Sequence, residues 1–153
     1  MSCLKIVPNG YVNLDASQGL IHGYIYPKSK YCGGMSVDPS HAAAQMEMVR
    51  KYWCQNYGRR LRHFVLSFTP DESIHLPSFD YVIRAAYEIC AYYAKDYQII
   101  FGIHTTPHLH IHFVMNMICY KNGKRFQARF ADDAQLASHI RNVISLPVEI
   151  VYF

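Results

Sequence analysis

The sequence lacks several features that mark particular classes of protein. No apolar run approaches the roughly 18 residues that a transmembrane helix needs, and the opening MSCLKIVPNG has no signal-peptide core. Internal repeats, linkers and low-complexity segments are also absent. We therefore expect one folded domain over residues 1–153, with no membrane partner.

Paired cysteine motifs are missing as well. The 5 cysteines are odd in number and form no C-x-x-C pair, which fits neither a disulfide framework nor a zinc knuckle. Reduced thiols are typical of the cytoplasm, so we expect a cytoplasmic protein. Charged residues make up only 17% of the chain and apolar residues 51%, which indicates a globular fold rather than a disordered chain.

Acidic residues are fewer than basic ones, 11 against 15, and the formal charge is +4. This mild excess allows an anionic partner without requiring one. The basic residues are grouped among 13 tyrosines, a pattern typical of single-stranded nucleic-acid binding, although most of these tyrosines are expected to fill half-buried positions. The candidate DNA-binding residues are Lys28, Lys30, Arg59, Arg60, Arg62, Lys124 and Arg125.

Strand-like and helix-like segments are mixed along the chain, which predicts an α+β fold. Asp38-Pro39 and Ser78 are helix-start signals, and Asn122-Gly123 is a hairpin-turn signal. Residues 13–26 are ambiguous, and residues 28–37 are expected to form a loop. Strands are expected over 4–7, 63–68, 98–103, 108–116, 125–130 and 148–153, and helices over 38–57, 79–95 and 132–145.

A row of histidines dominates the second half of the chain. His108, His110 and His112 alternate with apolar residues, which predicts a strand with all three on one face. Successive imidazoles lie about 6.6 Å apart, so two of them can converge on one metal ion, whereas the outer two are about 13 Å apart. His104, on the preceding strand, is the nearest third ligand. The alternative is an exposed strand face that merely carries histidine.

A metal site beside basic groups and tyrosines suggests phosphoryl transfer. A divalent ion would offset charge at the phosphate, and a tyrosine hydroxyl could attack phosphorus and hold the product covalently. Imidazole suits Zn, Mn, Fe, Ni and Cu, so the histidines alone do not choose the metal. Chemistry alone also does not select among the 13 tyrosines.

The histidine strand resembles the signature of the HUH endonucleases, two histidines separated by one bulky apolar residue. His110-Ile111-His112 fits this signature. The wider region is similar to the plasmid mobilisation relaxases of the MobA/VirD2-like group, which often read H-x-D-x-x-x-H-x-H-x-x-x-N. The matching histidines and asparagine are His104, His110, His112 and Asn116.

Two upstream segments extend the resemblance over nearly the whole chain. Relaxases of Gram-positive mobile elements carry a strand similar to H-x-x-x-S-F-x-P-x-E, which is matched by His63, Ser67, Phe68, Pro70 and Glu72. They also carry a short helix that ends in a nucleophilic tyrosine, often I-x-Y-I. The stretch from Ile21 to Ile25 resembles it and points to Tyr24, with Tyr26 as the second choice.

The resemblance implies a central antiparallel five-stranded sheet flanked by helices and a DNA relaxase activity that serves conjugation. His104, His110 and His112 would bind one Mg²⁺ or Mn²⁺ ion. Tyr24 would attack single-stranded DNA at an origin of transfer, giving a 5′-phosphotyrosyl link and a free 3′-OH, with accessory relaxosome proteins as further partners. Supporting roles would fall to Asn116, His63, Glu72 and His108.

One departure from the family pattern concerns a carboxylate. Thr105 stands where relaxases carry an aspartate soon after the first histidine, so Glu72 or Asp71 would have to replace it. Without such a replacement, the alternative is a catalytically inactive DNA-binding module of the same fold.

Another alternative uses the same histidines. The run from His108 to Val114 also fits the pattern of histidine-triad nucleotide hydrolases and transferases, in which the middle histidine attacks a nucleotide phosphate. That interpretation leaves His104 and the Ser67–Glu72 segment without a role. Replication initiators and transposases of the HUH group usually place the tyrosine after the histidines, where only Tyr120 and Tyr152 occur, outside any expected helix.

Overall fold

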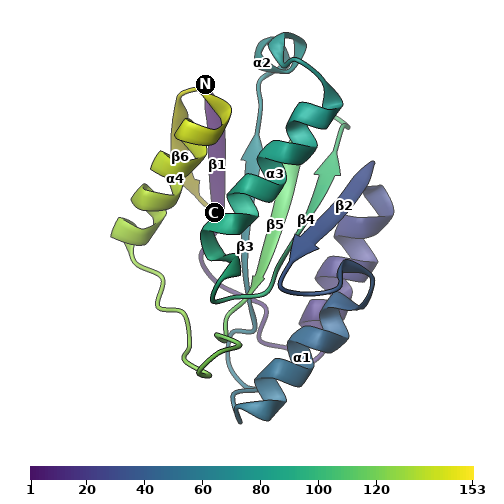
Figure 1. Ribbon diagram of the computed structural model, residues 1–153, viewed down its shortest axis with the longest axis vertical. Coiled ribbons are helices and arrows are strands. Elements are labelled where there is room, and N and C mark those ends of the chain that lie inside the picture. Colours follow the sequence, from purple (N-terminus) through teal and green to yellow (C-terminus); the bar gives the residue numbers. More distant parts are fainter.

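A computed structural model describes all 153 residues as a six-stranded sheet covered by helices (Figure 1). The strand order is β2-β4-β5-β3-β1-β6. Neighbouring strands are antiparallel except β1 and β6, which are parallel. The strands are β1 Ser2–Val7, β2 Tyr31–Met35, β3 Leu61–Ser67, β4 Ile99–His104, β5 His110–Asn116 and β6 Val148–Tyr152.

The helices confirm the predicted α+β class. Ser78 caps α3 as expected, because its side chain accepts a hydrogen bond from the backbone of Tyr81. No helix combines the length and apolarity needed to cross a membrane. The helical elements are the π-helix η1 Gln18–Ile25, the short 3₁₀ helices η2 Tyr26–Lys28 and η3 Pro39–His41, and the α-helices α1 Ala42–Tyr52, α2 Pro70–His75, α3 Phe79–Ala94 and α4 Phe130–Ile144.

The sheet has six strands rather than five because residues expected to form a loop add the edge strand β2. This strand was not predicted because it contains Gly33 and Gly34, and glycine is unfavourable in strands. Gly33 is nevertheless required here, because a Cβ atom would lie 2.6 Å from the Phe101 ring. Conversely, the strand expected over residues 125–130 does not form, and its only ladder contact is a bridge between Ile118 and Arg125.

Two helix predictions also needed correction. The helix expected to reach residue 57 ends as α1 at Tyr52, and Cys54 soon after it has a left-handed backbone with a φ of 55°. Helix α2 was not expected at all. Its start is a capping box in which Thr69 and Glu72 each bind the other's backbone amide.

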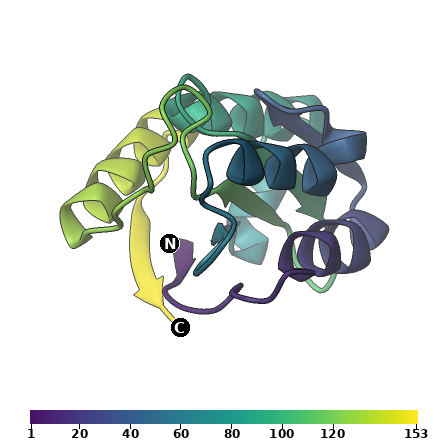
Figure 2. The ribbon, with the colours of Figure 1, turned by 90° about the horizontal axis from the view of Figure 1, so that it is seen from below.

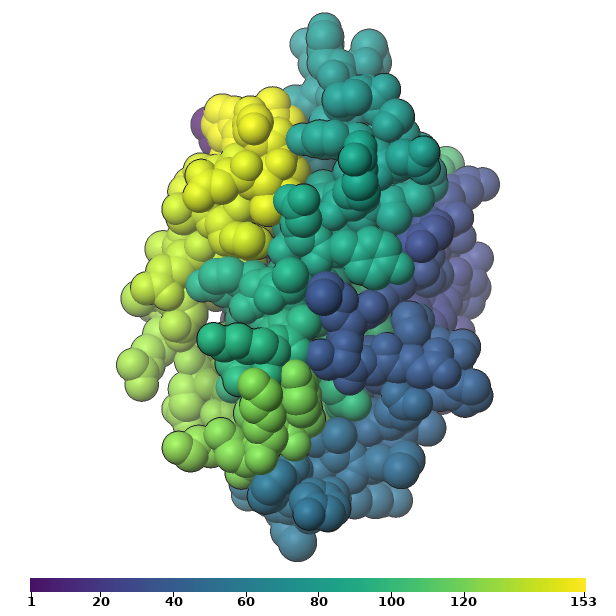
Figure 3. All heavy atoms as spheres, in the orientation of Figure 1, coloured from purple at the N-terminus to yellow at the C-terminus, as the bar shows by residue number.

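The two faces of the sheet are covered differently. On one face, α3 and α4 bury the larger apolar core, with Phe64, Phe101 and Phe113 fully buried beneath them. Figure 3 shows this face closed by the two packed helices. On the other face, η1 and α1 cover a smaller core that includes Ile25 and Val114. Figure 2 shows η1 and α3 on opposite sides of the sheet.

A buried polar network fixes the start of η1 against the sheet. The guanidinium of Arg50 is fully buried and donates to Asn116 Oδ1 at 3.1 Å, Ser17 Oγ at 3.0 Å and Asn56 Oδ1 at 3.3 Å. The Asn116 amide in turn donates to Gln98 Oε1 and to a backbone carbonyl of α1. Burial lowers the pKa of Arg50 to about 10, so the group stays charged at neutral pH without a carboxylate partner.

We expect Arg50→Lys to lower the free energy of unfolding by about 2 kcal/mol, because one ammonium cannot replace the three-way guanidinium contacts and leaves buried acceptors unpaired. Urea denaturation monitored by circular dichroism measures the change. Lys51→Arg is the matched control, since Lys51 is exposed on the same helix and pairs only with Glu47. An unchanged midpoint for Arg50→Lys would show that the network adds nothing to stability.

Candidate metal and nucleophile site

The histidine site is built on the hairpin of β4 and β5. His104 is the last residue of β4 and pairs in register with His110, the first residue of β5. The ligand nitrogens of His104, His110 and His112 all lie within 4.8 Å of one another. The cluster therefore takes one histidine from β4 and two from β5, and His108 lies outside it.

Each clustered histidine has one ring nitrogen in a hydrogen bond that points away from the other two histidines. His104 Nε2 donates to the carbonyl of Ile25 at 2.9 Å, and His110 Nδ1 donates to the carbonyl of His108 at 2.8 Å. His112 Nδ1 lies 2.9 Å from Nε2 of His63 on β3. In the neutral ring, the second nitrogen of His104 and that of His110 are left as lone pairs, which is the arrangement that metal-binding histidines adopt.

The donor set fits a metal ion. His112 Nε2 is buried and has no hydrogen-bond partner, which is costly unless a cation satisfies it. Burial lowers the pKa of His112 to about 3, with His63, His104 and His110 adding to the effect, and burial also lowers the pKa of His110. These two imidazoles are therefore neutral at neutral pH, as ligands must be.

The π-helix η1 places Tyr24 at this cluster. The Tyr24 ring lies edge-on to His112 and His104, with centroids 5.8 Å and 6.4 Å away, and it is 44% exposed. η1 approaches the sheet closely because Gly102 has no side chain. A Cβ atom there would lie 2.5 Å from Cγ2 of Ile25, the residue whose carbonyl binds His104. Ile25 thus contacts the sheet at Gly102 and also binds one of the clustered histidines.

Tyr26 is held elsewhere. Its hydroxyl donates to the carbonyl of Pro39 at 2.7 Å, and its ring packs against His22 rather than against the cluster. Burial raises the pKa of this hydroxyl, so it is a poor nucleophile. Geometry therefore favours Tyr24 over Tyr26.

Four of the seven expected DNA-binding residues serve the fold instead. Arg60 and Arg62 are 4% and 1% exposed, and Arg62 forms a buried ion pair with Asp133 at 2.7 Å. Arg59 and Arg125 donate to backbone carbonyls at both guanidinium ends. Lys28, Lys30 and Lys124 are exposed, and Lys28 Nζ lies 4.5 Å from the centre of the Tyr24 ring.

The expected supporting residues have mixed placements. Glu72 closes the capping box of α2 and lies 4.0 Å from the terminal ammonium group, and it does not reach the histidines. Asp71 is exposed in the same turn. Asn116 binds the Arg50 network rather than a histidine, and His108 contributes its backbone carbonyl. The family pattern, aligned on His104 and His110, places its aspartate at position 106 rather than at Thr105. Thr106 stands there and is exposed like Thr105, so no carboxylate completes the cluster.

Two residues near the site carried no sequence signal. Lys5 on β1 shares a row with Val65 and His112, and it helps to lower the pKa of His110 after the larger effect of burial. The Tyr11 hydroxyl lies 2.7 Å from Nδ1 of His63. Tyr11 lies before every recognisable motif in the sequence, so only the fold shows that it contacts His63. For Lys5, the alternation along the first strand indicates that its side chain lies on one face of the sheet, but does not indicate which face carries the histidines.

Comparison with known proteins identifies the family. A family model described as "Relaxase: MobA/VirD2-like, nuclease domain" matches residues 27–145. The chain belongs to this relaxase family. The match contains all three clustered histidines and begins after Tyr24. No curated protein and no solved structure matches the chain.

Membership explains the architecture. A mostly antiparallel sheet flanked by helices, with the histidines on central strands, agrees with the HUH relaxase fold. The relaxase nuclease domain is one that acts on single-stranded DNA, and the cluster of His104, His110 and His112 provides a metal-binding geometry for it.

Proposed function

We propose that this relaxase nicks one DNA strand at an origin of transfer in a metal-dependent reaction that uses Tyr24 as the nucleophile. The supporting observation is that the Tyr24 ring packs edge-on against two of the three clustered histidines. The tyrosine oxygen would bond to phosphorus as the bond from phosphorus to the 3′ oxygen breaks. The product is a 5′-phosphotyrosyl link, and the hydroxyl proton ends on the released 3′ oxygen. Because one phosphoester bond replaces another, rejoining the strand needs no other energy source.

The chain's own groups would prepare this step. His104, His110 and His112 would hold one Mn²⁺ or Mg²⁺ ion, which offsets charge on the phosphate oxygens. Lys28 beside the Tyr24 ring would attract the scissile phosphate, and Lys5 would bind a neighbouring phosphate on the side of β1. We propose the cytoplasm as the place of action, with relaxosome proteins as accessory partners.

A denaturing gel tests the nuclease directly. The protein would be mixed with single-stranded oligonucleotides tiled across the DNA element that encodes it, with Mn²⁺ or with a chelator. A metal-dependent, SDS-resistant adduct is expected. DNA binding without an adduct would favour the inactive binding module, and hydrolysis of a nucleoside phosphoramidate in the presence of chelator would favour a histidine-triad enzyme.

The two lysines predict a change in salt dependence. Each phosphate contact to single-stranded DNA contributes about 0.7 to the slope of log affinity against log salt concentration. We therefore expect Lys5→Gln and Lys28→Gln each to reduce the slope by about that amount. Fluorescence anisotropy at several salt concentrations measures it, with Lys51→Gln as the control because Lys51 pairs with Glu47 on α1. Unchanged slopes would place the DNA elsewhere.

A further inference from the structure

A chain of three side chains extends from the metal site to a surface loop. His112 Nδ1 lies 2.9 Å from His63 Nε2, and His63 Nδ1 lies 2.7 Å from the Tyr11 hydroxyl. The two imidazoles lie edge to edge in nearly one plane, with centroids 5.2 Å apart and planes 24° apart, as an in-plane hydrogen bond between ring nitrogens requires. His63 is buried and Tyr11 half-buried. The hydrogen bond between His63 and His112 is therefore shielded from solvent, whereas Tyr11 lies closer to the surface.

Metal binding fixes the direction of both hydrogen bonds. If the partnerless Nε2 of His112 presents its lone pair to an ion, the proton of this ring must sit on Nδ1. His112 then donates to His63 Nε2, and the proton of His63 sits on Nδ1 and is donated to the Tyr11 oxygen. In this arrangement His63 cannot take a proton from Tyr11, so Tyr11 is an acceptor and not a nucleophile.

A metal-binding histidine usually donates its second ring N–H to a carboxylate, a carbonyl or water. At His112, the side chains of His63 and Tyr11 occupy this position. His104 and His110 each use a backbone carbonyl, whereas Nδ1 of His112 faces the imidazole of His63. We propose that His63 and Tyr11 are positioning residues that hold His112 in its metal-binding tautomer, replacing the missing carboxylate. This inference rests on the metal site of the proposed function.

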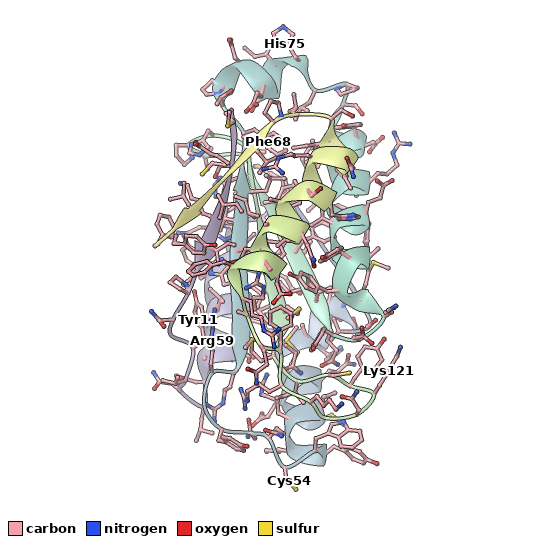
Figure 4. The ribbon with its side chains drawn as sticks, turned by 90° about the vertical axis from the view of Figure 1, so that its left-hand side faces the viewer. Tyr11, Cys54, Arg59, Phe68, His75 and Lys121 are labelled. Carbon is pink, nitrogen blue, oxygen red and sulfur yellow. The ribbon has the colours of Figure 1, made fainter.

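Contacts around Tyr11 indicate that its position is built in. Arg59 donates to the carbonyls of Val7 and Pro8, which lead into the Tyr11 loop. The Arg60 backbone donates to the Tyr11 carbonyl at 2.9 Å, and its guanidinium binds the carbonyl of Val12. Figure 4 shows Tyr11 and Arg59 side by side below β1. Arginines expected to contact DNA thus hold the loop that presents Tyr11.

Mn²⁺ titration by calorimetry tests the inference without DNA. We expect His63→Leu to weaken Mn²⁺ binding by about 10–100-fold, the usual cost of losing a partner of a metal-binding histidine. His63→Gln should recover most of the loss, since its amide can accept from His112 and donate to Tyr11. His139→Gln, on the far helix α4, is the control, and thermal melts check that each variant folds.

If His63 had a purely structural role, the His63→Gln and His63→Leu variants would bind Mn²⁺ equally well whenever their thermal stabilities were equal. Wild-type affinity in a folded His63→Leu variant would overturn the inference and leave the nuclease proposal standing. Failure of the wild-type protein to bind Mn²⁺ would overturn both. Normal Mn²⁺ binding without a DNA adduct would count against the nuclease alone.

Nitrogen-15 NMR of labelled histidines gives a second readout in the metal-free protein. His63 and His112 should both carry their proton on Nδ1, and Tyr11→Phe should let His63 sample both tautomers because its acceptor is gone. Detection of His112 with its proton on Nε2 in the wild-type protein would overturn the assigned direction.

Discussion

Replacing Tyr24 by phenylalanine is expected to abolish the covalent protein–DNA adduct while Mn²⁺ binding persists. The change removes only the hydroxyl oxygen that would bond to phosphorus. The ring, its edge-on packing against His104 and His112 and its contact with Lys28 all remain. A denaturing gel with labelled oligonucleotide measures the adduct, and calorimetry measures the metal.

Tyr26→Phe is the matched control, because it removes a hydroxyl two residues away on the same segment. It loses the hydrogen bond to the Pro39 carbonyl, which is worth about 1 kcal/mol of stability. We expect a somewhat less stable protein that still forms the adduct. An adduct formed by Tyr24→Phe, or lost only in Tyr26→Phe, would transfer the nucleophile assignment to the other tyrosine.

His112→Ala is expected to remove measurable metal binding and, with it, the adduct. His112 provides the buried, partnerless nitrogen, and the two remaining imidazoles cannot replace it. The all-nitrogen donor set also predicts a metal preference. Mg²⁺ favours oxygen ligands and gives up its waters reluctantly, whereas Mn²⁺, as a first-row transition ion, accepts nitrogen ligands more readily, so Mn²⁺ should support the adduct at a lower concentration than Mg²⁺. Titration of each ion against adduct yield measures this preference.

His108→Ala is the control for the metal experiment. His108 belongs to the same row of histidines but contacts the cluster through its backbone carbonyl, which alanine retains. Near-normal Mn²⁺ affinity is therefore expected. If His108→Ala lost the metal while His112→Ala kept it, the ion would be bound by a different set of histidines.

Local patterns were enough to predict the centre of the site. Alternation along 108–112 established which histidines share a face, and the short connection to the previous strand brought His104 into register with His110. The α+β class and the Ser78 cap followed from equally local signals. Each of these depends on residues that are neighbours in sequence or on adjacent strands.

Predictions failed where a side chain's role depends on distant backbone. Arg59, Arg60 and Arg125 looked like a basic surface, yet their guanidinium groups bind carbonyls of loops that only the fold brings near. The strand expected over residues 125–130 is also missing, and there Arg125 binds backbone carbonyls of residues 55–59 through its side chain. Tyr11 escaped notice because its partner, His63, lies 52 residues later.

The winding of η1 carries a consequence for the geometry of attack. A π-helix closes its hydrogen bonds at i+5 rather than i+4, and in an α-helix one residue corresponds to about 100° of rotation. Winding the same eight residues as an α-helix would add rotation at every step from Gln18 to Tyr24. The accumulated rotation would carry the tyrosine around the helix axis, away from the histidines. The winding of η1 therefore sets the direction in which Tyr24 faces the histidine cluster.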